Sequence, residues 1–419
     1  MEKALLVSVQ IKTDKHHWRI EDISSELEEL TISAGAQVVE NIISICQKPT
    51  ANYLIGKGKV EEISLIAHDE DVDTVIFSHD LSGTQQRNLE EAIGKKTLDR
   101  TQLILDIFSR RAKSPEGKMQ VELAQLQYLL PRLTGKGVIL SRMGGGIGTR
   151  GPGEQKLEVD RRRIKKKIDK LRDDLKAFRS HRLVTHKRRK ENNLPSVVLV
   201  GYTSAGKSTL LNLLVGTSQP ISEKLFTTLD PLSKSLQLPG GQNIILSDTV
   251  GFLHELPHHL IEAFKATLEE VSEADLLVHV LDVHDHRLYQ HSQAVQSVLG
   301  ELGCGDKPVI AALNKIDLVE DRSWLELLKK EFAPGVLISA KSGENLDTLI
   351  KEIESHFLGL MLNLKIIIPH SRMELVDFFY RQAKVNKIDY LQEGIRIDLN
   401  ISRQLYSSLG SDKDVKVIN

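Results

Sequence analysis

A buried strand followed by a glycine-rich turn and an apolar helix constrains this chain more than any other feature. Residues 196–200 read SVVLV, and residues 201–208 read GYTSAGKS before the helical pattern TLLNLLVG. In this setting the glycines let backbone N–H groups converge on phosphate oxygens at a helix N-terminus, and Lys207 adds a positive charge. The segment therefore predicts a doubly wound sheet that binds nucleotide phosphates.

A second motif supplies the groups that a magnesium-nucleotide complex needs. A predicted strand ends in DTVG at 248–251. Asp248 can hold Mg²⁺ through water while Ser208 offers its hydroxyl, and the Gly251 N–H can reach a γ-phosphate. Between the two motifs lies FTTLDP, in which we predict Thr228 to be the switch threonine that reaches Mg²⁺.

Two later strand ends decide which base is bound. One strand ends in NKID at 314–317 and another in SAK at 339–341. Asp317 can accept from both guanine N1–H and the exocyclic amine, Lys315 can lie over the base, and the Ala340 N–H can donate to O6. Adenine would leave Asp317 unpaired, at a cost of a few kcal/mol. Each short motif occurs by chance, but their order at successive strand ends predicts a GTPase.

The predicted site has three groups of residues. Catalytic roles are assigned to Lys207, Thr228 and Gly251, and magnesium binding to Ser208 and Thr228. The predicted GTP-binding residues are Gly201, Tyr202, Thr203, Ser204, Ala205, Gly206, Lys207, Ser208, Thr209, Phe226, Thr227, Thr228, Asp248, Thr249, Val250, Gly251, Asn314, Lys315, Asp317, Ser339, Ala340 and Lys341.

Phe252 follows the DTVG glycine, where a Ras-type enzyme has the glutamine that orients the attacking water. A phenyl ring can neither donate nor accept the hydrogen bond that this task needs. We therefore expect slow hydrolysis in isolation, completed by a partner, a monovalent cation or another loop. Packing of Phe252 within the switch region is compatible with this expectation.

Composition favours a reducing, aqueous setting. Apolar residues make up 40% of the chain and charged residues 27%, and no apolar run approaches the roughly 20 residues of a membrane span. Cys46 and Cys304 are the only cysteines, which argues against a disulfide framework. Met1 begins a strand-like segment without a signal-peptide pattern. We expect a cytoplasmic monomer, with peripheral membrane association left open. Histidines 254, 258, 259, 284, 286 and 291 match no metal-ligand spacing and are expected at the surface.

With 419 residues the chain has room for two to four domains. We predict an α/β protein, in which a Ras-like P-loop GTPase domain is joined by an N-terminal α/β domain, a helical hairpin and a small C-terminal α+β module. The predicted boundaries are 1–112 for the N-terminal domain, 113–192 for the hairpin, 193–360 for the GTPase domain and 361–419 for a β-α-β-β module.

The hairpin is strongly basic. From Lys156 to Lys190 there are 16 Lys and Arg against 5 Asp and Glu. Such a density on a projecting helix suits binding to a phosphate backbone, although a solvated basic face is the simpler alternative. The predicted RNA-binding residues are Arg142 and Arg150 on the glycine-rich tip and Arg161, Arg162 and Arg163 on the second helix.

Several long segments resemble the HflX family of translational GTPases. They include ANYLIGKGKVEEI, LDRTQLILDIF, GKMQVELAQLQYLLPRL, SRMGGGIGTRGPGE, DRRRI and DTVGFLHELPHHLIEAFKATLEE, and together with the nucleotide motifs they cover most of the chain. The resemblance implies ribosome-stimulated GTP hydrolysis, binding to the large (50S) ribosomal subunit and its rRNA, and splitting of 70S ribosomes into subunits under stress. It also implies that the basic tip approaches the peptidyl-transferase region.

Two positions depart from the family pattern. Mg²⁺ is the cofactor expected from Ser208 and Asp248. Ser204 stands where the family usually has an asparagine that helps related GTPases hold K⁺, so K⁺ is in doubt. His254 stands where arginine is common. Three alternatives stay open: a ribosome-assembly GTPase, an ATP-dependent RNA-remodelling enzyme that uses the N-terminal half, and a non-catalytic RNA-binding scaffold.

Overall fold

The computed structural model describes most of the chain. The described residues are 1–13, 18–133, 152–191, 194–216, 225–226, 232–254, 257, 260, 268–359, 361–402 and 416–418. Four of the predicted site residues therefore lie outside the described residues, namely Arg142, Arg150, Thr227 and Thr228.

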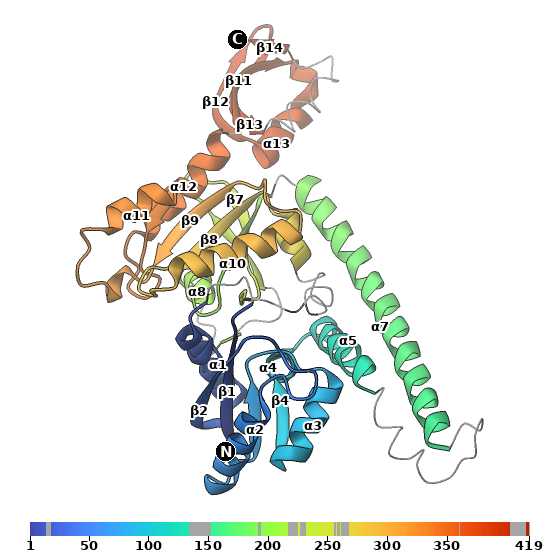
Figure 1. The fold of residues 1–419 in the computed structure, drawn as a ribbon. Helices are drawn as coiled ribbons and strands as arrows, with labels where there is room; N and C mark the ends of the chain where they lie inside the picture. Colours follow the sequence, from blue (N-terminus) through green and yellow to red (C-terminus); the bar gives the residue numbers. More distant parts are fainter. Residues whose placement is uncertain are drawn as a thin grey trace.

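The first domain is a parallel sheet covered by helices on both faces, and it forms the lower part of the molecule in Figure 1. The strand order is β2-β1-β3-β4, with helices α1 and α4 on one face and α2 and α3 on the other. Buried Leu27 and Leu30 of α1 and Phe108 of α4 form the core of the first face. The elements are β1 (Lys3–Ile11), α1 (Ile20–Ala34), β2 (Gln37–Cys46), α2 (Lys57–Asp69), β3 (Thr74–Phe77), α3 (Gly83–Ile93), β4 (Lys96–Asp99) and α4 (Arg100–Arg111).

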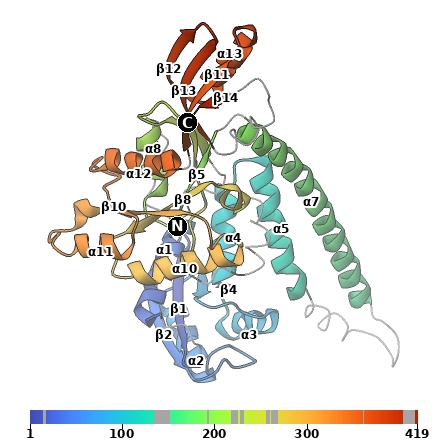
Figure 2. The ribbon, with the colours of Figure 1, turned by 90° about the horizontal axis from the view of Figure 1, so that it is seen from above.

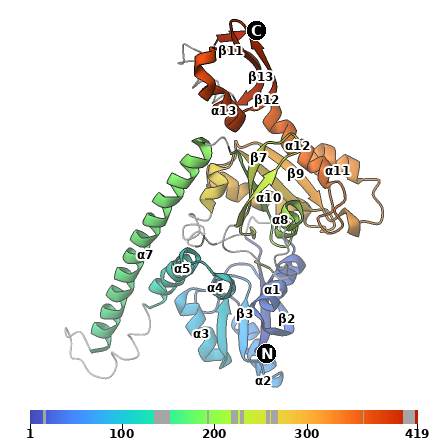
Figure 3. The ribbon, with the colours of Figure 1, turned by 180° about the vertical axis from the view of Figure 1, so that it is seen from behind.

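Two antiparallel helices follow, α5 (Pro115–Arg132) and α7 (Pro152–Glu191). Helix α5 begins at a Ser114 cap that accepts from the Gly117 N–H at 2.8 Å. Leu123 of α5 packs with Ile168, Leu171 and Leu175 of α7, and this apolar cluster holds the two helices together, as the leucine spacing predicted. The 40 residues of α7 span about 60 Å, and Figures 1 and 3 show α7 running along the outside of the molecule. Phe178, which we expected in the apolar stripe, is 36% exposed.

The third domain contains a six-stranded sheet in the order β10-β9-β8-β5-β7-β6. Five strands are parallel, as expected, and β6 (Leu232–Gln237) adds an antiparallel edge next to β7 (Asn243–Asp248). Helices α8 (Lys207–Val215) and α12 (Leu346–Gly359) pack on one face of this sheet. The other elements are β5 (Ser196–Gly201), β8 (Leu276–Asp282), α10 (Leu288–Glu301), β9 (Val309–Asn314), η1 (Ile316–Leu318), α11 (Leu325–Glu331) and β10 (Gly335–Leu337).

A small antiparallel module closes the described chain (Figure 2). Its strand order is β12-β13-β11-β14, and Val376 and Phe379 of α13 pack against the sheet. This is the predicted β-α-β-β arrangement with one further short strand. The elements are β11 (Met361–Ile368), η2 (His370–Arg372), α13 (Met373–Gln382), β12 (Lys384–Leu391), β13 (Gly394–Ser402) and β14 (Lys416–Ile418).

These units confirm the predicted α/β fold class. The exact domain boundaries at 112, 192 and 360 stay a prediction. Within the described part of the chain, no helix combines the length and the apolar character that crossing a membrane requires.

Candidate functional site

The turn between β5 and α8 has the backbone of a phosphate-binding loop. Gly206 lies at φ 99° immediately before Lys207 begins α8. A Cβ at Gly206 would come within 2.3 Å of the Asn314 side-chain nitrogen, so a larger residue would push Asn314 away. Ser204, at the crest of the loop, is exposed and has φ 61°. The backbone N–H groups at the start of α8 are thus available to an anion.

Lys207 lies at the centre of this loop and is only 6% exposed. Its ammonium donates to the carbonyls of Gly201 at 3.0 Å and Tyr202 at 2.7 Å. Burial lowers the pKa of Lys207 to about 8, although the nearby Asp248 carboxylate acts in the opposite direction. A bound phosphate would favour the charged form of this lysine.

Ser208 and Asp248 meet at the end of β7. The Ser208 hydroxyl donates to Asp248 Oδ2 at 2.6 Å. A hydroxyl beside a carboxylate is an oxygen donor set of the kind that Mg²⁺ prefers, so these residues fit the metal that the sequence implied. The neighbouring Thr249 and Val250 are buried, and the Thr249 hydroxyl donates to the Leu199 carbonyl at 2.8 Å, so only their backbone can face a nucleotide.

The predicted base-binding residues converge on the other side of the loop. Asn314 Nδ2 donates to the Ala205 carbonyl, and the Ala340 N–H donates to Asn314 Oδ1, both at 2.8 Å. The Ala340 N–H, which we expected to donate to guanine O6, is therefore engaged by Asn314 in this structure. The Ser339 hydroxyl donates to Asp317 Oδ1 at 2.6 Å and so fixes the carboxylate that would read guanine.

Lys315 forms an ion pair with Asp282 at the end of β8. The ammonium is thereby fixed, and the aliphatic stem is left to cover a base. Lys341 and Ser204 are exposed at the rim of the site, and Thr209 is half-buried.

Two predicted positions carry side chains that lie in hydrophobic cores. Phe252 is 1% exposed and packs with Val198 and Val200, so its ring is turned away from the phosphate loop. Phe226, predicted to bind GTP, is 3% exposed and meets Phe108 edge-on, with ring centroids 4.6 Å apart.

The residues that surround Tyr202 belong to no motif and were not predicted. The Tyr202 hydroxyl donates to Glu26 of α1, and its ring stacks on His291 with centroids 3.7 Å apart and planes 11° apart. His291 is 7% exposed rather than at the surface, so that expectation was wrong for this residue, and burial lowers its pKa to about 4. Glu26 lies in an ordinary amphipathic helix, so no motif marked it. A cavity of about 160 Å³ lies between α1 and the loop, lined among others by Glu29, Ser204 and Lys315.

The predicted RNA-binding arginines of α7 lie on its solvent face. Arg161, Arg162 and Arg163 are exposed. Arg162 forms an ion pair with Glu158 and Arg163 forms one with Asp160, each at 3.7 Å. Such exposed ion pairs are weak, so they offset little of the positive charge of the helix. The face remains strongly basic.

This arrangement of a glycine-rich turn at a strand–helix junction, a Ser–Asp pair and strand-end residues is that of a GTPase of the P-loop class. Four family models match the chain in sequence order. They are described as GTP-binding GTPase N-terminal (residues 21–109), GTP-binding GTPase Middle Region (111–189), 50S ribosome-binding GTPase (196–315) and HflX C-terminal domain (329–412).

Relatives match over nearly their full length. GTPase HflX of Caldanaerobacter subterraneus subsp. tengcongensis is 43% identical over 408 residues, covering 97% of this chain and 93% of the relative. GTPase HflX of Escherichia coli K12 is 37% identical over 401 residues, covering 96% and 93%. The chain belongs to the HflX family of GTPases. Among solved structures, a GTP-binding protein from the archaeon Sulfolobus solfataricus in complex with GDP is 27% identical, with a TM-score of 0.45 and coverage of 85% of this chain and 98% of that one.

Proposed function

We propose that this GTPase binds the large (50S) ribosomal subunit in its GTP form, splits 70S ribosomes into subunits, and hydrolyses GTP to leave. The observation that carries the proposal is the combination of a nucleotide domain matched by a 50S ribosome-binding GTPase model with a 40-residue basic helix on the same chain. Binding energy in the GTP form is sufficient for splitting, provided that the bound protein clashes with contacts between the subunits.

In this proposal the nucleotide is held by the residues described above. Lys207 and the N–H groups at the start of α8 bind the phosphates, Asp317 reads guanine, and Asn314 ties the base-binding loop to the phosphate-binding loop. Ser208 and Thr228 would hold Mg²⁺, with Asp248 hydrogen-bonded to Ser208, and the ion would neutralise phosphate charge. We include no K⁺, because Ser204 offers a single hydroxyl where related enzymes have an asparagine.

Hydrolysis then depends on a group from outside. The buried ring of Phe252 leaves no side chain at that position to orient water. The ribosome is the proposed source of the missing group, and the exposed arginines 161, 162 and 163 are proposed to bind rRNA through its phosphates.

The test is sedimentation of intact 70S ribosomes after incubation with the protein and a non-hydrolysable GTP analogue. We expect separate subunit peaks with the wild type and an unchanged 70S peak with Lys207→Ala. Replacing Arg161, Arg162 and Arg163 with glutamate, which reverses their charge, should also abolish splitting. The same replacement of the exposed Lys48, Lys57 and Lys330 should leave splitting unchanged. If the wild-type protein binds the 50S subunit and leaves 70S ribosomes intact, the splitting claim is wrong and an assembly role is favoured.

A further inference from the structure

Helix α5 connects the N-terminal domain to the basic helix α7, and Figures 2 and 3 show it lying between α4 and α7. Two stripes of apolar residues run along α5. Val121, Ala124 and Tyr128 are buried in the same core as helices α1 and α4. Leu123 is buried against α7, and Leu126 is partly buried beside it. The position of α7 relative to the N-terminal domain therefore depends on how α5 is docked.

A buried ion pair attaches the last residue of α5 to the N-terminal domain. Arg132 Nη2 donates to Asp99 Oδ2 at 2.9 Å and to the Leu81 carbonyl at 2.6 Å. Its Nη1 donates to the Tyr128 carbonyl at 3.0 Å, and the guanidinium lies 3.4 Å from the centre of the Tyr128 ring. Gly83 lets α3 approach the same turn closely, because a Cβ there would lie 3.2 Å from Arg132 Cα. Arg132 therefore joins α5 to the end of β4 and to the loop before α3.

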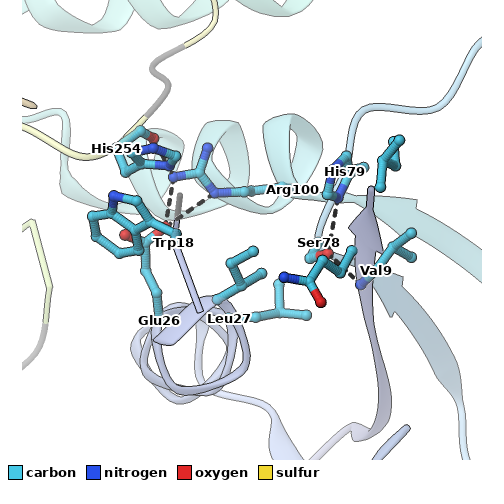
Figure 4. A pocket seen from close by; sticks show the side chains of 11 residues that line it. Val9, Trp18, Glu26, Leu27, Ser78, His79, Arg100 and His254 are labelled. Atoms are coloured by element: carbon cyan, nitrogen blue, oxygen red, sulfur yellow. Dashed lines mark hydrogen bonds and ion pairs between the residues drawn. The ribbon is translucent and has the colours of Figure 1, made fainter. Parts of the chain in front are cut away.

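The partner of Arg132 is itself firmly held. Asp99 is fully buried, and its other oxygen accepts from the Gln102 N–H at 2.8 Å as the N-terminal cap of α4. Next to Asp99, Arg100 forms a second buried ion pair, with Glu26 of α1 at 2.6 Å (Figure 4). The start of α4 is therefore a fixed support to which the end of α5 is attached.

The attached end of α5 is also the end that lies near the exposed arginines of α7. The two helices are antiparallel, and Leu130 of α5 and Ile164 of α7 belong to the same cluster between them. Residues 161–163 therefore lie at the same end of the helical pair as Arg132. Apolar contacts alone have little directionality, whereas hydrogen bonds and ion pairs need a defined geometry. The contact between Arg132 and Asp99 is thus suited to fix the direction of this pair.

We propose that Asp99 and Arg132 are positioning residues for RNA binding, because they fix the end of the helical pair that carries arginines 161–163. This role rests on the RNA binding proposed above. Without the ion pair the two helices sample several directions, and only the fraction that suits the RNA can bind. The apparent dissociation constant rises by the inverse of that fraction, so a fraction of about one in ten weakens binding about tenfold.

The first test measures binding to purified 50S subunits with a non-hydrolysable GTP analogue. Asp99→Asn keeps an oxygen for the cap of α4 but turns an NH₂ group toward Arg132, and it leaves no unpaired carboxylate in the core. We expect its affinity for 50S subunits to be roughly tenfold lower than that of the wild type, while its affinity for GDP is unchanged. Arg132→Lys keeps the charge but loses the fork that reaches Asp99 and Leu81 together, so its loss should be smaller.

Spin labels measure the direction of α7 itself. Glu91→Cys on α3 and Lys170→Cys on α7 place labels at two exposed positions, in a Cys46→Ser background that leaves only the buried Cys304. Pulsed electron paramagnetic resonance should give one narrow distance distribution with the native ion pair and a broader distribution with Asp99→Asn. A residue that only stabilises the fold would leave this distribution narrow.

Phe77→Leu is the matched control. Phe77 is fully buried between the sheet and helices α2 and α3, on the face opposite to α4, so its replacement should lower stability without changing the 50S affinity or the distance distribution. An Asp99→Asn variant with the 50S affinity of the wild type, or with an equally narrow distance distribution, overturns the positioning role. A wild-type protein that does not bind 50S subunits overturns the proposed function itself, and the positioning role with it.

Discussion

Asn314 ties the two halves of the nucleotide site together, so Asn314→Ala tests the arrangement directly. Asn314 is 2% exposed and makes two hydrogen bonds of 2.8 Å, one to the Ala205 carbonyl and one from the Ala340 N–H. Alanine leaves a buried acceptor and a buried donor without partners, at about 1–3 kcal/mol each. The two losses add to about 2–6 kcal/mol. If about 2–4 kcal/mol of this destabilises the bound state more than the free protein, GDP affinity drops by roughly 30- to 900-fold.

Titration with a fluorescent GDP analogue measures this loss, and circular dichroism at the same temperature verifies folding. Asn41→Ala is the control, because Asn41 also makes side-chain hydrogen bonds, to Ser8 and Ser24, but within the N-terminal domain. We expect the control to lower the melting temperature without changing GDP affinity. GDP binding by folded Asn314→Ala within twofold of the wild type would show that these two hydrogen bonds do not support the nucleotide site.

Three further predictions concern single side chains. Asp317→Asn keeps one acceptor but presents an NH₂ group to a guanine N–H, so GDP affinity should fall on the order of 100-fold. Xanthosine diphosphate should bind this variant better than GDP does. A competition assay in which the substitution lowers the affinities for both nucleotides equally would contradict the base-reading role. Burial lowers the pKa of Lys207 to about 8, and bound phosphate favours the charged form. GDP affinity should therefore be independent of pH below pH 8 and fall by up to about tenfold per pH unit above it. An affinity that does not change from pH 7 to 9, measured beside Lys207→Met, would exclude titration of Lys207 as a determinant of GDP binding. Burial lowers the pKa of His291 to about 4, below the unfolded value near 6.5. The contribution of neutral His291 to the free energy of unfolding is therefore complete above pH 6.5 and falls by about 3 kcal/mol as the pH drops toward 4. His291→Phe keeps a ring against Tyr202, so urea unfolding at pH 7 and pH 4.5 should show that this variant loses less stability in acid than the wild type.

The fold and the nucleotide motifs were predictable because both depend on local pattern. The apolar run before Gly201 predicts a buried strand whatever surrounds it, and the residues after parallel strands must meet at one edge of the sheet. Ser208 and Asp248 lie 40 positions apart, yet this rule was enough to predict that they meet. The Ser208 hydroxyl donates to Asp248 Oδ2 at 2.6 Å.

Contacts between domains could not be predicted in the same way. Glu26, Trp18 and Arg100 lie in ordinary helical or loop sequence, and their partners Tyr202 and His254 lie more than 150 positions away. No period or spacing encodes such a pairing. Strand β6 was missed because LSKSLQ is a half-exposed edge strand with few apolar residues.

We propose that this GTPase acts on the large ribosomal subunit through the site built around Lys207. GTP turnover by the wild type and by Lys207→Ala, each with and without purified 50S subunits, tests it most directly. We expect slow turnover by the wild type alone and clear acceleration by 50S subunits. The Lys207→Ala variant should show no turnover, with or without 50S subunits. Wild-type turnover that is unchanged by 50S subunits, or a Lys207→Ala variant that is stimulated equally, would contradict it.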